Sequence, residues 1–120
     1  MVTLKFKNMF RIFGCFIFRN EGNGCLTSVY LEHNGIRQFT ESCIRRGNTN
    51  DTDPFVGEYN TSWLEPENRT ALLTIAIDDN NNGLYNLTWT EISGSENFQY
   101  SGKGFMHEGR LLGTYWGRTE

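Results

Sequence analysis

The stretch NGLYNLTWTE, residues 82–91, alternates bulky and polar side chains directly after an Asn-Gly pair. An extended chain places alternate residues on one side, here Tyr85, Leu87, Trp89 and Glu91. The other side carries the polar residues Asn86, Thr88 and Thr90. Asn-Gly is a strong signal for a tight hairpin turn, and alternation with period two is typical of a strand with one buried face. The stretch therefore predicts a β-strand over 84–92 whose aromatic side faces a core.

Turn-forming residues recur at short intervals along the whole chain. They cluster at seven places, 21–24, 33–35, 47–54, 65–69, 78–83, 93–97 and 107–109. The segments between them are rich in β-branched and aromatic residues and are too short for typical helices. Seven turns imply about eight strands, which we expect to form an all-β antiparallel meander. Closure of the meander into a barrel would remove its unpaired edges.

The sequence around the strand at 84–92 is similar to a stretch near the N-terminus, NGCLTSVYLE at 23–32, and this internal similarity is named here the echo. A shift of 59 residues gives six identities and one Tyr-to-Trp exchange between residues 23–42 and 82–101. We interpret the chain as a single domain, 1–120, made of two pseudo-repeats at about 1–55 and 56–117. The alternative is the general likeness of β-hairpins to one another.

Several motifs in the second half form a recognisable pattern. They are VGEY at 56–59, the alternating LTIAI at 73–77, the pair Tyr85 and Trp89, YSGKGFM at 100–106 and LLGTYWG at 111–117. This pattern resembles the half-barrel of calycin-like proteins, the group of lipocalin-like and avidin-like barrels that includes uncharacterised bacterial ones. The resemblance implies a small barrel of the ligand-binding kind and no particular ligand. Lipocalins usually have Gly-x-Trp where this chain has Gly57-Glu58-Tyr59. Residues 100–116 also resemble a MORN hairpin, but without its short repeat period.

Strand alternation places a set of candidate ligand-binding side chains inside the barrel. By the echo, the inward side of residues 26–32 lines the wall opposite Trp89. Phe98 and Tyr115 add aromatic surface, and Gly102 and Gly104 leave a hollow or a sharp bend. An eight-stranded barrel holds either a packed core or one small ligand. The candidate ligand-binding residues are Tyr30, Glu32, Tyr59, Trp63, Trp89, Glu91 and Tyr100.

The carboxylates Glu32 and Glu91 bear on the choice between a pocket and a packed core. A buried ionised carboxylate costs on the order of several kcal/mol unless it is paired or hydrogen-bonded. Each therefore lies at a wet rim, bonds a partner or anchors a ligand. We predict a non-enzymatic carrier or sensor that binds a small, partly apolar ligand in an aromatic pocket. The alternative is a solid barrel that acts as a protein-interaction or oligomerisation module.

Signals for catalysis are weak. His33 and His107 both fall in expected turns, and neither has a neighbouring Ser or Cys in a known nucleophile motif. A carboxylate pair could carry out acid–base chemistry, but its geometry is not encoded locally. We favour binding over catalysis and assign no catalytic residue, metal site or cofactor.

The chain has three cysteines, an odd number with no Cys-x-x-Cys spacing. This pattern favours buried, reduced thiols and a cytoplasmic location over a zinc site or a disulfide framework. Four Asn-x-Ser/Thr motifs leave secretion open. They begin at Asn50, Asn60, Asn68 and Asn86.

The charge balance argues against nucleic acid and membrane partners. Fourteen acidic residues outnumber eleven basic ones, for a net charge of −3, and the basic residues are dispersed. Nucleic-acid binding rests on clustered Lys and Arg. The apolar run near the N-terminus is interrupted by Arg11, lacks a small-residue cleavage site, and is too short for a transmembrane helix.

Residues 10–18 are apolar on both sides. Phe10, Ile12, Phe16 and Phe18 share one side, and Phe13, Cys15 and Ile17 share the other. A barrel strand that faces water ordinarily has a polar outer side. An apolar outer side therefore indicates that another segment or subunit packs against it. This covering element is either the segment 2–7 or another subunit, and we predict a homodimer packed through Phe13 and Ile17.

Overall fold

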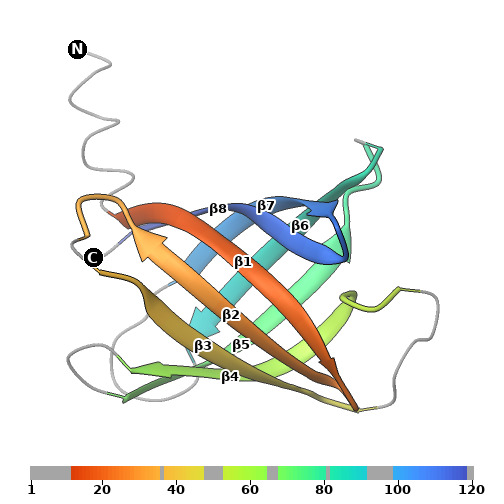
Figure 1. Ribbon diagram of the computed structural model, residues 1–120, viewed down its shortest axis with the longest axis horizontal. Coiled ribbons are helices and arrows are strands. Elements are labelled where there is room, and N and C mark those ends of the chain that lie inside the picture. Colours follow the sequence, from red (N-terminus) through yellow and green to blue (C-terminus); the bar gives the residue numbers. More distant parts are fainter. Residues whose placement is uncertain are drawn as a thin grey trace.

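The computed structural model describes residues 12–35, 37–47, 53–64, 68–80, 82–91 and 99–118. The described residues form eight strands: β1 (Ile12–Gly22), β2 (Cys25–Glu32), β3 (Phe39–Arg45), β4 (Gly57–Leu64), β5 (Asn68–Ile77), β6 (Leu84–Glu91), β7 (Gln99–His107) and β8 (Arg110–Arg118). Each strand pairs antiparallel with the next, and β8 pairs with β1 to close a barrel (Figure 1). The predicted all-β meander of eight strands is therefore confirmed.

Two of the hairpin turns have positive φ angles at both of their central residues. Asn23 and Gly24 connect β1 to β2 with φ of 54° and 77°, and Glu108 and Gly109 connect β7 to β8 with φ of 51° and 78°. Two consecutive positive φ angles match the right-handed twist of the flanking strands. The turn expected at 93–97 lies outside the described residues.

The strand connections alternate between the two ends of the barrel (Figure 1). The β1–β2, β3–β4, β5–β6 and β7–β8 connections meet at one end, named here the closed end. The β2–β3, β4–β5 and β6–β7 connections meet at the other, named here the open end. The two ends differ because a buried side chain from the β3–β4 connection fills the barrel at the closed end.

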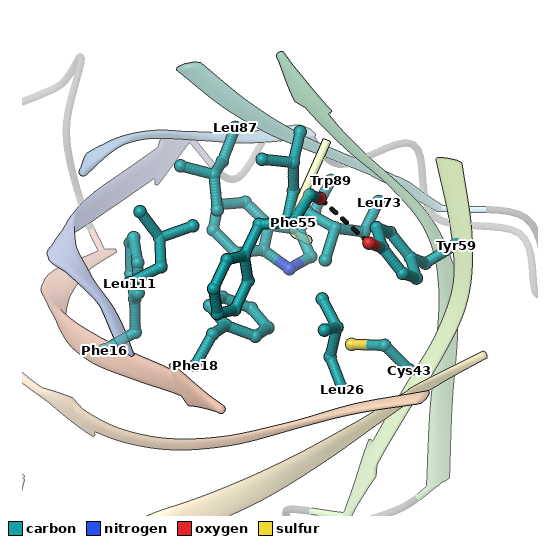
Figure 2. Close-up of a cluster of buried hydrophobic side chains, with 11 residues drawn as sticks. Phe16, Phe18, Leu26, Cys43, Phe55, Tyr59, Leu73, Leu87, Trp89 and Leu111 are labelled. Atoms are coloured by element: carbon teal, nitrogen blue, oxygen red, sulfur yellow. Dashed lines mark hydrogen bonds between the residues drawn. The ribbon is translucent and has the colours of Figure 1, made fainter. Parts of the chain in front are cut away.

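Residues 53–56 of the β3–β4 connection turn back over the closed end. The Asp53 carboxylate accepts hydrogen bonds from the N–H groups of Phe55 at 2.8 Å and Val56 at 3.2 Å, a local bond pattern that Asp favours in turns. The Tyr59 hydroxyl donates to the Phe55 carbonyl at 2.8 Å. The Phe55 side chain is fully buried, and its ring belongs to the core cluster. Figure 2 shows the ring in the barrel interior with Phe18, Leu26 and Leu111.

Two more side chains from the barrel wall hold this connection in place. Asn20 Nδ2 donates to the Pro54 carbonyl at 2.6 Å. The Tyr85 hydroxyl donates to Asp53 Oδ2 at 2.6 Å. Burial, together with the neighbouring Asp53 carboxylate, raises the pKa of Tyr85 to about 12, so the phenol remains a donor at neutral pH. The closed end is thereby attached to both β1 and β6.

Glycines of β7 make room for side chains from neighbouring strands. A Cβ atom at Gly102 would lie 3.0 Å from the Trp89 ring, and one at Gly104 would lie 3.1 Å from Leu111 Cδ1. The space expected beside these glycines is therefore occupied by side chains. The middle of the barrel is a packed core, and a pocket has room only nearer the open end.

The internal echo corresponds to matching strand bounds. A shift of 59 residues carries β2, Cys25–Glu32, onto β6, Leu84–Glu91, without a change of length. A regular meander also repeats its strands at even intervals. The two pseudo-repeats therefore stay a prediction.

Candidate ligand-binding pocket

A pocket lies at the open end of the barrel. It holds about 450 Å³ of space between atoms, counting the part open to solvent, and about 50 Å³ of this can hold the centre of a water-sized sphere. A bound water needs roughly 10–15 Å³ by the second measure. The pocket therefore has room for a few water-sized groups, and it opens to solvent. Its lining residues are Ile12, Phe16, Tyr30, Glu32, Glu41, Trp63, Trp89, Tyr100 and Tyr115.

Trp89 separates the pocket from the core. Its side chain is only 6% exposed, which confirms the predicted inward orientation. Its ring packs against Phe16 and Phe18, with centroid distances of 5.9 and 6.5 Å. The indole N–H donates to Glu41 Oε2 at 2.9 Å. Packing on the core side and a hydrogen bond on the polar side hold the indole in one orientation.

Tyr115 connects the aromatic walls of the pocket. Its ring makes edge-to-face contacts with Tyr30, Trp89 and Tyr100, at centroid distances of 6.1, 6.3 and 6.2 Å. Such pairs contribute roughly 0.5–1.5 kcal/mol beyond the area they bury. The cross-strand partner of Tyr115 on β1 is Gly14, where a Cβ atom would lie 2.8 Å from the Tyr115 ring. The absence of a side chain at Gly14 therefore leaves room for the Tyr115 ring.

Glu41 is the polar centre of the pocket. It lies on β3, and its side chain is 6% exposed. Its Oε2 accepts hydrogen bonds from Thr61 Oγ1 at 2.5 Å and Trp89 Nε1 at 2.9 Å, and a weak one from Cys43 Sγ at 3.8 Å. The donors that the structure describes all reach Oε2. The other oxygen, Oε1, has no described donor.

The environment of Glu41 disfavours its charged form. Burial raises the pKa of Glu41 above its ordinary value of 4.5, and the hydrogen bonds from Thr61, Trp89 and Cys43 act in the opposite direction. Burial and the neighbouring Glu41 also raise the pKa of the Cys43 thiol well above its usual range. Cys43 therefore stays a thiol, and it lacks the thiolate that a nucleophilic cysteine needs. A positive ligand would stabilise the charged form of Glu41.

A second carboxylate, Glu32, lies at the mouth of the same pocket. It is the last residue of β2, pairs with Gly14 of β1, and is half-buried. Among the described residues that line the pocket there is no Lys, Arg or His. The described lining therefore carries two carboxyl groups and no basic group.

Five of the seven predicted site residues line this pocket, namely Tyr30, Glu32, Trp63, Trp89 and Tyr100. The other two lie elsewhere. Tyr59 is fully buried toward the closed end, where Arg45 Nη2 donates to its hydroxyl at 2.9 Å. Glu91 ends β6 and is not among the described residues that line the pocket. Phe98, an expected aromatic neighbour, lies outside the described residues.

The sequence prediction missed Glu41, although a local signal for it exists. In the segment FTESCIR, 39–45, strand alternation places Phe39, Glu41 and Cys43 on one side. A carboxylate on the inward side of the third strand can be read from this pattern. Its two strong donors lie 20 and 48 residues further along the chain, so their convergence depends on the closed barrel.

The cysteines and acidic residues offer no other site. All three cysteines are free thiols, but only Cys43 is buried, while Cys15 is exposed and Cys25 is half-buried. In the part of the chain that the structure describes, no group of three or more His, Cys, Asp or Glu side chains could hold a metal ion. No helix among those same residues has the length and apolar character to span a membrane.

Comparisons with known protein families, with curated proteins and with solved structures find no match for this chain. The structure supports the barrel architecture implied by the calycin-like resemblance, and no relative adds to it. Because one fold hosts many functions, the pocket is the feature from which a function can be inferred.

Proposed function

We propose that the protein is a non-enzymatic carrier or sensor of the calycin-like type, which binds one small, partly apolar molecule in the pocket at the open end. The observation that carries this proposal is a small cavity with six aromatic side chains and a buried, hydrogen-bonded carboxyl group, Glu41. Small-molecule sites are typically apolar hollows with a few polar groups that orient the ligand. The aromatic contacts around Tyr115 support a pocket that is formed before a ligand enters.

The positions of the reactive side chains support binding rather than catalysis. His33 is exposed and stacks on Phe13, with ring centroids 4.3 Å apart. His107 is exposed at the last position of β7, beside the turn at the closed end. The Cys43 thiol is held in its protonated form. Within the described residues, the pocket offers carboxyl and phenol groups but no activated nucleophile.

The three tryptophans allow this proposal to be tested residue by residue. Trp63 and Trp89 line the pocket, whereas Trp116 follows the pocket residue Tyr115 on β8 and therefore faces outward. We expect at least one of toluene, choline and 3,3-dimethylbutan-1-ol to shift the indole N–H signals of Trp63 and Trp89 saturably in ¹H–¹⁵N spectra, and to leave Trp116 unchanged. Shifts confined to Trp116, or no saturable shift, would contradict the proposal.

A matched pair of variants separates the pocket from the outer surface. Trp63→Leu is expected to weaken binding of whichever of these compounds binds, because it removes a wall of the pocket. Trp116→Leu removes the same side chain from the outer face and is expected to leave binding unchanged. Equal effects of the two substitutions would place the binding site elsewhere.

A second candidate function, oligomerisation, is favoured by an apolar row on the outside of the barrel. Val29, Ile17, Leu112 and Phe105 are successive cross-strand partners on β2, β1, β8 and β7 and form what we name the outer row. Ile17 is 40% exposed and Phe105 is 49% exposed. Contiguous exposed apolar residues commonly mark interaction surfaces. We propose a second copy of the chain as the partner, because the row can pack on itself about a twofold axis.

Ile17→Lys is expected to abolish this dimer, because it places a charge at the centre of the outer row. Light scattering at high micromolar concentration should give twice the chain mass of 13.9 kDa for the natural protein and the single mass for the variant. Ile44→Lys changes another exposed isoleucine, on β3 and outside the row, and should remain dimeric. A natural protein that is monomeric at this concentration would refute the proposed interface.

A further inference from the structure

We infer that the molecule bound in the pocket is a small organic cation, an amine or a quaternary ammonium compound; this inference rests on the proposed binding function. Two carboxyl groups, Glu32 and Glu41, line the pocket. No positively charged side chain is found among its described lining residues. A cationic ligand would therefore complement the carboxyl groups of the described lining.

The aromatic walls favour the same class of ligand. Ring faces of Trp and Tyr attract a cation within about 6 Å of the ring centroid, and the attraction is strongest where water is excluded. The rings that line the pocket include Tyr30, Trp63, Trp89, Tyr100 and Tyr115. A neutral ligand could make apolar contacts and hydrogen bonds but would lack the charge attraction, and an anion would be repelled by any ionised carboxylate. A cation gains from both the rings and the carboxylates.

Glu41 is positioned as the anchor for the positive charge. It is more than nine-tenths buried, and Thr61 and Trp89 fix its Oε2 from the protein side. Oε1, which has no described donor, is the oxygen left for a ligand. A carboxylate held in this way needs little rearrangement to meet a cation, and such preorganisation increases affinity.

The cross-strand neighbour of Glu41 is also short of hydrogen bonds. Ser28 pairs with Glu41 between β2 and β3, is buried, and its Oγ has no partner. Buried hydroxyl groups are usually hydrogen-bonded. Two buried polar atoms of the described interior lack a partner, Ser28 Oγ beside Glu41 and Arg45 Nε toward the closed end. The first of them could bond the polar end of a ligand held by Glu41.

Cation binding should depend on pH through Glu41. Burial raises the pKa of Glu41, so the empty pocket holds a proton on this group to a higher pH than a solvated carboxyl does. A bound cation favours the ionised form, so affinity is expected to increase with pH as Glu41 loses its proton. The described titratable groups that share its surroundings are Cys43, Glu32, Tyr30, Tyr100 and Tyr115.

Three compounds of nearly the same shape test the inference. Choline is the cation, 3,3-dimethylbutan-1-ol is its neutral carbon analogue, and 3,3-dimethylbutanoate is the anion. In titrations followed by the Trp63 and Trp89 indole signals, choline is expected to bind roughly tenfold more tightly than the alcohol. The anion is expected not to bind. An alcohol that binds as tightly as choline would overturn the inference but leave the binding function intact. Failure of all three compounds and of toluene would overturn both.

Glu41→Gln keeps the shape of the anchor and removes its charge. The variant is expected to lose most of the preference for choline over the alcohol, and the remainder is attributed to Glu32 and the aromatic rings. Glu58→Gln, a substitution at an exposed position of β4, should retain the preference for choline. Glu32→Gln provides a second pocket variant, with a partial loss of preference expected because Glu32 is less buried. Retention of the full preference in both pocket variants would show that these carboxylates do not recognise the charge.

Discussion

Replacement of Phe55 with alanine is expected to lower the free energy of unfolding by about 3–5 kcal/mol, the usual range for removal of a buried phenylalanine ring. Phe55 is fully buried, and its neighbours come from several strands of the barrel. The walls cannot collapse into the vacated space without breaking their pairing, so a cavity would remain. Urea unfolding followed by tryptophan fluorescence measures the difference.

The control for this prediction is an exposed apolar residue. Ile44 is 63% exposed on β3, and Ile44→Ala is expected to change stability by less than about 0.5 kcal/mol. Asp53→Ala should reproduce part of the Phe55 effect, because it removes the acceptor that shapes the connection and the partner of Tyr85. A Phe55→Ala variant as stable as Ile44→Ala would show that the closed end does not depend on this ring.

Replacement of Glu41 with glutamine is expected to stabilise the protein at neutral pH. Burial raises the pKa of Glu41 in the folded protein, so the folded state favours the protonated side chain. The stabilisation that comes from protonated Glu41 is fully present below the unfolded-state pKa, near 4.5. That contribution is lost as the pH rises through the folded-state pKa, because the unfolded chain ionises more easily. The glutamine side chain does not titrate, and its amide oxygen can accept the hydrogen bonds from Thr61 and Trp89.

The measurement is the stability difference between Glu41→Gln and the natural protein, determined by urea unfolding at several pH values. The difference should be smallest near pH 4.5, grow with pH, and become constant above the folded-state pKa. Glu58→Gln serves as the exposed control, for which a flat difference is expected. A constant Glu41→Gln difference across the range would contradict the assigned effect of burial.

The two expected effects of Glu41→Gln belong together. A variant that is more stable yet loses its preference for choline cannot owe that loss to unfolding. Binding sites are commonly less stable than the surrounding structure would allow, because a group needed for function is buried at a cost. Under the proposed function Glu41 has this character, and its replacement would separate stability from recognition.

Local pattern was sufficient for the strands and for much of the pocket. Alternation in β6 and β2 correctly placed Trp89, Leu87 and Leu26 inside the barrel. The same rule places Glu41 inward on β3. These inferences succeed because the side-chain period of a strand depends only on its backbone.

The remaining features depend on contacts between distant parts of the chain. Phe55 belongs to a connection, where no alternation applies, and its place depends on bonds from Asn20 and Tyr85 to the same connection. Tyr59 lies toward the closed end and Trp63 lines the pocket, although both lie on β4. The position of each residue along the barrel axis depends on the stagger between neighbouring strands. The sequence of one strand does not encode this stagger.

The closure of one end by residues 53–56 has a kinetic consequence. Because the Phe55 ring fills the closed end of the described structure, a molecule bound as proposed would have to leave through the open end before a competitor could enter. In a displacement experiment at saturating competitor, the observed rate should then equal the departure rate of the resident and should not rise with further competitor. A partner protein that bound over the open end would control both the binding and the release of the ligand.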